Sequence, residues 1–133
     1  MVERTKAEGI DEFDGTVRLV ELVPDQLNPD RQQWHIEIEP EDKELLKESK
    51  TKAFHEWLRI TETATENSVA EGSKTDNYIK EIEAVMPATK KLSKVEQVFR
   101  AMEGKKFHFV KKILGKSFGG HPAKPSFVPQ RLL

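Results

Sequence analysis

Basic and aromatic side chains alternate in the last thirty residues of the chain, and this combination suits contacts with phosphates and bases. From Gly104 onward there are seven Lys and Arg residues and no acidic residue. Cations neutralise phosphates, and aromatic rings stack on bases that no second strand covers. The candidate groups are Lys105, Lys106, Lys111, Lys112, Lys116 and Lys124, interleaved with Phe107, His108, Phe109, Phe118 and His121.

The charge of the chain is divided unevenly between its two halves. Residues 1–66 carry 9 Lys and Arg against 17 Asp and Glu, whereas residues 67–133 carry 13 against 6, and the net charge is −1. Such a split predicts a localised positive field on a nearly neutral molecule. A second interpretation stays open, in which the basic half is only a solvated edge that balances the acidic half.

Trp57 is a second candidate for contact with a base. Residues 53–61 read as a strand in which Phe54 and Leu58 share one face. If that face is the core, Trp57 stands on the outer face between His55 and Arg59. The alternative is a kinked strand that buries the indole, because tryptophan is usually well buried. Among the later aromatic residues, Phe107 and Phe109 suit the core, whereas Phe118 lies in a Gly- and Pro-rich loop and suits function better.

Several classes of chemistry find no support in the sequence. There is no cysteine, which excludes disulfides, thiol nucleophiles and Cys-ligated metals. Gly115, Lys116 and Ser117 match the end of a phosphate-binding loop, but the motif also needs a glycine where Val110 stands. The four histidines, at 35, 55, 108 and 121, are well separated along the chain, so we expect no metal site and no cofactor. We find no catalytic constellation and expect no enzyme.

Hydrophobic periodicity predicts strands over residues 13–23, 33–39, 53–61, 105–114 and 127–132. In the first strand Val17 and Leu19 share a face opposite Arg18 and Val20, and Gly15 indicates a bulge or a close backbone approach. The second strand places Trp34, Ile36 and Ile38 in the core and His35, Glu37 and Glu39 in water. Pro129 lacks an amide donor, which restricts the last strand to a sheet edge or a closing position.

Two helices are predicted between the third and fourth strands. Ser73 and Ser93 each open a capping-box pattern before an apolar stripe. Pro87 ends the first helix, and Gly104 stands where a C-terminal glycine would end the second.

Three strands, a helical insertion and two further strands give the element order of the OB-fold. Gly15 in the first strand and the run Glu103-Gly104-Lys105-Lys106-Phe107 before the fourth add to the likeness. Over residues 13–132 the chain resembles small archaeal or phage-type single-stranded DNA-binding OB proteins. The resemblance implies a β-rich α+β fold, a five-stranded OB-like Greek-key barrel with a two-helix insertion between strands 3 and 4. We expect a flexible N-terminus over residues 1–12 and a single domain over residues 13–133.

The resemblance implies non-enzymatic, largely sequence-independent binding of single-stranded DNA, and the residues do not distinguish DNA from RNA. The outer face of the second and third strands would carry His35, Trp57 and Arg59, with Arg18 nearby on the first strand. Glu37 and Glu39 share that face and would repel phosphates. Lysines around the fourth strand and the loop after it would complete the site.

An alternative function of a different class stays open. The basic C-terminal half could dock an acidic protein partner, with the chain acting as an assembly subunit of a viral or replication complex or as a homo-oligomer. No apolar run approaches membrane-spanning length, so we expect no membrane association and a cytoplasmic location.

Overall fold

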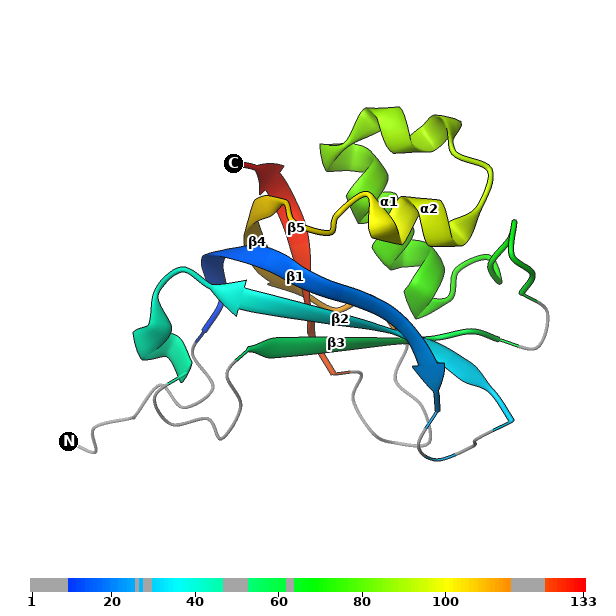
Figure 1. The fold of residues 1–133 in the computed structure, drawn as a ribbon, viewed down its shortest axis with the longest axis horizontal. Helices are drawn as coiled ribbons and strands as arrows, with labels where there is room; N and C mark the ends of the chain where they lie inside the picture. The colour runs from blue at the N-terminus through cyan, green and yellow to red at the C-terminus, as the bar shows by residue number, and fades with distance from the viewer. Residues whose placement is uncertain (1–9, 26, 28–29, 47–52, 62–63, 116–123) are drawn as a thin grey trace.

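In the computed structural model, residues 10–25, 27, 30–46, 53–61, 64–115 and 124–133 are described. Five antiparallel strands form one sheet in the order β3-β2-β1-β4-β5 (Figure 1). The strands are β1 (Glu12–Pro24), β2 (Gln32–Pro40), β3 (Phe54–Arg59), β4 (Lys106–Lys112) and β5 (Ser126–Leu132). Most of the predicted N-terminal segment, residues 1–9, lies outside the described residues.

Two α-helices, α1 (Lys74–Val85) and α2 (Val95–Arg100), lie between β3 and β4 in the chain. Short 3-10 helices cover Lys43–Leu46 and Pro87–Lys91. Figure 1 shows α1 and α2 together on one side of the sheet. The fold is therefore a β-rich α+β arrangement, as the sequence predicts. In the described part of the chain, no helix is long and apolar enough to cross a membrane.

The first helix begins at the predicted residue and the second does not. The Ser73 hydroxyl accepts a hydrogen bond from the Asp76 amide at 3.1 Å, which satisfies an otherwise unpaired donor of the first turn. In α2 the N-cap is Lys94 rather than Ser93, so the predicted cap is wrong by one residue. Gly104 has φ of 80°, but it comes several residues after Arg100, where α2 ends.

One face of the sheet and the inner faces of both helices form the core. Trp34, Ile36 and Ile38 are all nearly or fully buried, as the strict alternation in β2 predicts. Phe107 and Phe109 in β4 are also fully buried, which confirms their predicted place in the core. From the helices, Tyr78, Ile82, Val98 and Phe99 pack into the same cluster, together with Met102 just after α2.

Strand β1 departs from the predicted alternation. A bulge lies between Val17 and Leu19, so one residue is added on β1 relative to β2. The side chains beyond the bulge therefore change face, and Val20 instead of Leu19 joins Val17 in the core. The close approach predicted at Gly15 is present, because a Cβ there would lie 3.0 Å from the Glu39 carbonyl oxygen.

The two edge strands, β3 and β5, are connected through α1. The Thr75 hydroxyl donates to the Arg59 carbonyl at the end of β3 at 2.7 Å. One turn later, the Tyr78 hydroxyl donates to the Phe127 carbonyl in β5 at 2.8 Å. The helix is therefore attached to both edges of the sheet. Pro129 lies in β5, and this strand is at the sheet edge, as its missing amide donor predicts.

Side chains also connect β3 directly to β5. The rings of Phe54 and Phe127 lie 5.2 Å apart, and the Glu56 carboxylate accepts a hydrogen bond from the Phe127 amide at 3.2 Å. Glu56 points into the protein and is 7% exposed. Burial raises its pKa to about 7, although the positive charge of Lys74 opposes the shift.

Candidate functional site

Trp57 lies on the outer face of β3 and is 39% exposed. Its neighbours Glu56 and Leu58 point inward, because side chains alternate along a strand. The antiparallel register places Trp57 directly opposite His35 on β2. The two rings lie parallel, with centroids 4.0 Å apart and 8° between their planes. One face of the indole is therefore covered by His35, while the side chain as a whole stays partly exposed.

His35 is 6% exposed, so its predicted place on a wet face is wrong. Trp57 covers the imidazole ring, which the alternation in β2 alone cannot show. Nδ1 of His35 lies 2.8 Å from a Glu21 carboxylate oxygen, and Nε2 lies 2.7 Å from Nδ1 of His55. Two histidines that are twenty positions apart in the sequence are thus in direct contact. The pairing register of β2 and β3 brings the two histidines together, and their spacing along the chain does not predict this contact.

Arg18 is bound to the acidic residues of the same face. Its Nε lies 2.7 Å from one oxygen of Glu37, and its Nη1 lies 3.5 Å from Glu39. The hydrogen bond from Arg18 lowers the pKa of Glu37 below its usual value. Burial, together with the neighbouring His35, lowers the pKa of His55. Arg18 therefore offsets part of the negative charge of the two carboxylates that would repel a phosphate.

Three other predicted cationic residues also have acidic partners. Lys106 lies 2.6 Å from Glu41, and Lys112 lies 2.7 Å from Glu81 on α1. Arg59 lies 3.1 Å from the buried carboxylate of Asp25, although its own side chain stays 63% exposed. These pairs reduce the positive charge that the sequence of this half suggests.

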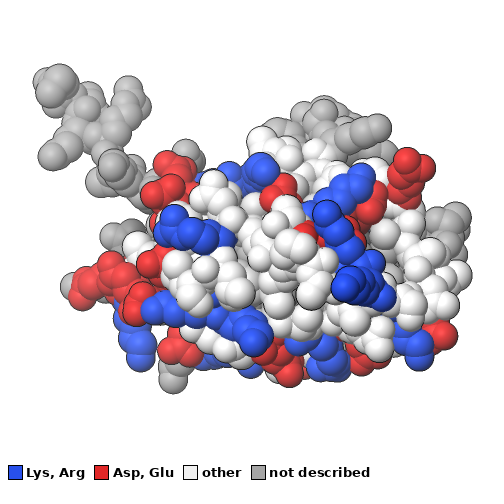
Figure 2. Space-filling view, turned by 90° about the horizontal axis from the view of Figure 1, so that it is seen from above, with Lys and Arg blue, Asp and Glu red and all other residues white. Residues whose placement is uncertain are grey.

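The remaining predicted cations differ in their surroundings. Lys105 and Lys124 are exposed, and no described residue forms an ion pair with either, whereas Lys111 is partly buried in β4. Lys116 and Phe118 lie outside the described residues, as does His121. Figure 2 shows basic and acidic side chains interspersed on the visible face, without one continuous basic patch.

The aromatic residues of β4 do not accompany its lysines on the surface. Phe107 and Phe109 are fully buried, as noted above, and His108 is bound through Nδ1 to Asp14 at 2.7 Å. Among the described residues, the structure therefore does not bring the predicted set into one site. Arg18 on β1 and Trp57 and Arg59 on β3 lie on one face of the sheet, on the two strands that flank β2, whereas the described lysines of that set lie on or next to β4 and β5.

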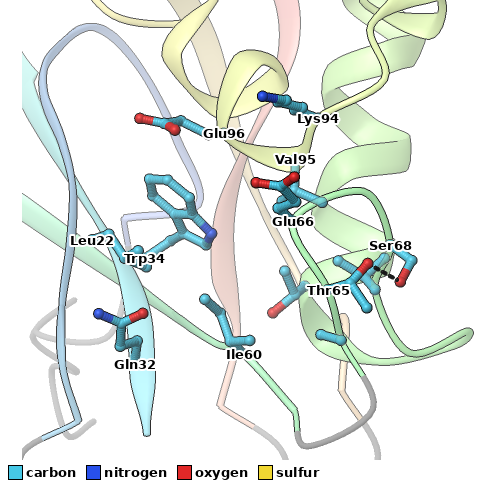
Figure 3. Close-up of a pocket in the computed structure, with 13 residues that line it drawn as sticks. Leu22, Gln32, Trp34, Ile60, Thr65, Glu66, Ser68, Lys94, Val95 and Glu96 are labelled. Carbon is cyan, nitrogen blue, oxygen red and sulfur yellow. Dashed lines mark hydrogen bonds between the residues drawn. The ribbon is translucent and has the colours of Figure 1, made fainter.

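A separate cavity of about 380 Å³ opens beside the end of the sheet. Figure 3 shows Leu22, Trp34 and Ile60 on one side and Glu66 with Val95 on the other. Its lining combines these apolar side chains with charges of both signs, from Lys94, Glu66 and Glu96. The shape and polarity suit a small apolar group, but no pair of titratable side chains converges inside it.

The outer face of β2 and β3 is therefore the best-developed site in the described part of the chain. It offers a partly exposed indole, an adjacent guanidinium and a hydrogen-bonded histidine pair. Comparison of the chain with protein-family models, with curated proteins and with solved structures finds no match.

Proposed function

We propose that the outer face of β2 and β3 binds single-stranded nucleic acid with little sequence preference. The observation that carries this proposal is the partly exposed Trp57, held parallel to His35 at 4.0 Å. A ring fixed in this way loses little freedom when a base stacks on its open face. Base–aromatic stacking contributes about 1–3 kcal/mol per base and depends little on base identity.

We further propose that the sheet is an OB-like, partly closed Greek-key barrel. The strand order β3-β2-β1-β4-β5 leaves β3 and β5 as the strands that closure would bring together. Phe54 and Glu56 on β3 already contact Phe127 on β5, and α1 binds both strands. OB-folds bind oligonucleotides on the β2–β3 face, which is the face that carries Trp57.

The charges of the site favour modest affinity. Arg59 is adjacent to Trp57 along β3 and exposes most of its side chain, so it can approach a phosphate beside a stacked base. Glu37 and Glu39 would repel that phosphate, but Arg18 compensates part of their charge. Lys105 and Lys124 can add contacts further along the strand. We therefore propose a binding module that uses few phosphate contacts and gains much of its affinity from stacking.

Fluorescence of Trp57 tests this proposal directly. The chain has two tryptophans, and Trp34→Phe replaces the buried one while keeping an aromatic ring in the core. Adding oligo(dT) to this variant should quench the remaining emission in a saturable way, whereas duplex DNA of equal length should quench it far less. Emission that oligo(dT) leaves unchanged, from a protein that elutes as a stable oligomer, would contradict the proposal and favour an assembly role.

A further inference from the structure

The same face of the sheet contains a cluster of side chains whose donor atoms point toward one another. One nitrogen each from His35 and His55 and one oxygen from Glu37 all lie within 4.8 Å of each other. We infer that these three residues bind one divalent transition-metal ion, and that zinc is the ion that fits best. Two imidazoles with one carboxylate form a donor set that zinc commonly takes in proteins.

Glu21 holds His35 in the orientation that a metal ligand needs. The carboxylate lies 2.8 Å from Nδ1 of His35, which places the ring proton on that nitrogen. Nε2 is then the nitrogen with a free lone pair, and it is the one directed toward His55. In metal sites, the second ring nitrogen of a ligating histidine commonly donates its proton to a carboxylate. This hydrogen bond fixes the tautomer and makes the ligand more basic.

Arg18 performs a similar role for Glu37. It binds one carboxylate oxygen at 2.7 Å, so the other oxygen, Oε1, faces His55 Nδ1 at 3.8 Å. The three ligands are also sheltered to different degrees, since the side chains of His35, Glu37 and His55 are 8%, 17% and 28% exposed. Trp57 covers His35 from the outside. An ion would thus be reached through the His55 and Glu37 side.

Binding requires a small opening of the cluster and a change of tautomer in His55. The two histidine nitrogens lie 2.7 Å apart and share one hydrogen bond. In a tetrahedral zinc site with bonds of 2.0–2.1 Å, two ligand nitrogens lie about 3.3 Å apart. The ion would take the place of the shared proton at His55 Nδ1, and the neutral ring would then carry its proton on Nε2 instead. Three protein ligands leave a fourth position for water or for an oxygen of a bound ligand.

Calorimetric titration of the untagged protein with Zn²⁺ tests the site without any nucleic acid. The expected result is one ion per chain, with loss of this binding in His55→Ala and in Glu37→Gln. Glu21→Gln should raise the Kd about ten- to a hundred-fold, because it removes only the outer partner of His35. Far-UV circular dichroism checks that each variant is folded.

His108→Ala is the matched control. His108 lies on β4 of the same sheet and is bound to a carboxylate, Asp14, at 2.7 Å, and no metal-ligand cluster among the described residues includes it. Its loss should leave the Kd for Zn²⁺ unchanged. Titration with Co²⁺ adds a spectroscopic check, since a nearly tetrahedral site gives strong visible absorption that should vanish in Glu37→Gln even if His55→Ala does not fold. No binding by the native chain, or binding that only His108→Ala removes, would overturn the inference.

Discussion

The indole ring of Trp57 stacks on the imidazole ring of His35, with 4.0 Å between their centroids. The histidine is in turn bound to Glu21 and His55 through its two nitrogens. The aromatic surface that we propose for base stacking and the cluster that we propose for zinc therefore share one residue. Because Trp57 stacks on His35, a metal bound to His35 would also fix the orientation of the Trp57 ring.

The number of phosphate contacts can be measured through the salt dependence of binding. If Arg59, Lys105 and Lys124 supply the contacts, log K should fall against log salt concentration with a slope of about −2, at about −0.7 per contact on single strands. Lys105→Gln should make the slope shallower by about 0.7. Lys106→Gln should change the slope much less, because Lys106 already forms an ion pair with Glu41. Equal effects of the two variants, in anisotropy titrations with labelled oligo(dT), would contradict this assignment of contacts.

Stability should depend on pH through Glu56. Its pKa is about 7 in the folded protein, against an ordinary value of 4.5, so the folded state keeps a proton that the unfolded state releases between these values. The free energy of unfolding should therefore fall as the pH rises from about 4.5 to 7, by up to about 3 kcal/mol.

Glu56→Gln should remove this pH dependence while keeping an acceptor for the Phe127 amide. Urea denaturation at pH 5 and pH 8 measures the difference, and the exposed Glu71→Gln serves as the control. We expect the gap between the two pH values to narrow in Glu56→Gln alone. A gap as wide as in the native chain would show that the carboxyl group does not titrate in this range.

A methyl group at position 15 should destabilise the sheet. A Cβ on Gly15 would lie 2.9 Å from Cε2 of Phe13 and 3.0 Å from the carbonyl oxygen of Glu39 on the paired strand. Backbone atoms of a paired strand cannot move away without a cost in energy, so Gly15→Ala should lower the free energy of unfolding by about 1–3 kcal/mol. Thr16→Ala is the control for strand propensity, because Thr16 follows Gly15 in β1 and lies on the outer face. Thermal unfolding of both variants gives the comparison, and equal melting temperatures would show that the strands relax around the methyl group.

The strands and the core were predictable because they depend on local periodicity. Trp34, Ile36 and Ile38 alternate with polar residues, and this pattern alone assigns them to the inner face. The bulge after Val17 could not be predicted, since one added residue leaves the local pattern ambiguous and only pairing with β2 fixes it.

The candidate site was predictable only in part. Trp57 is on the outer face because its strand neighbours are inside, which is a local argument. The burial of His35 depends on a ring from another strand, and the neutralisation of Lys106 depends on Glu41, which is far away in the sequence. Contacts of this kind follow from the register and from tertiary packing, so composition overstates the positive charge of the surface.

The affinity of Trp57→Leu for oligo(dT) tests the central claim most directly. Leucine keeps an apolar side chain beside His35 but removes the ring on which a base can stack. The account predicts a Kd at least about five-fold higher than that of the native chain, corresponding to the lower end of 1–3 kcal/mol per stacked base, with Trp57→Phe closer to the native value. Equal affinities for the native chain and Trp57→Leu, with both proteins folded, would contradict it.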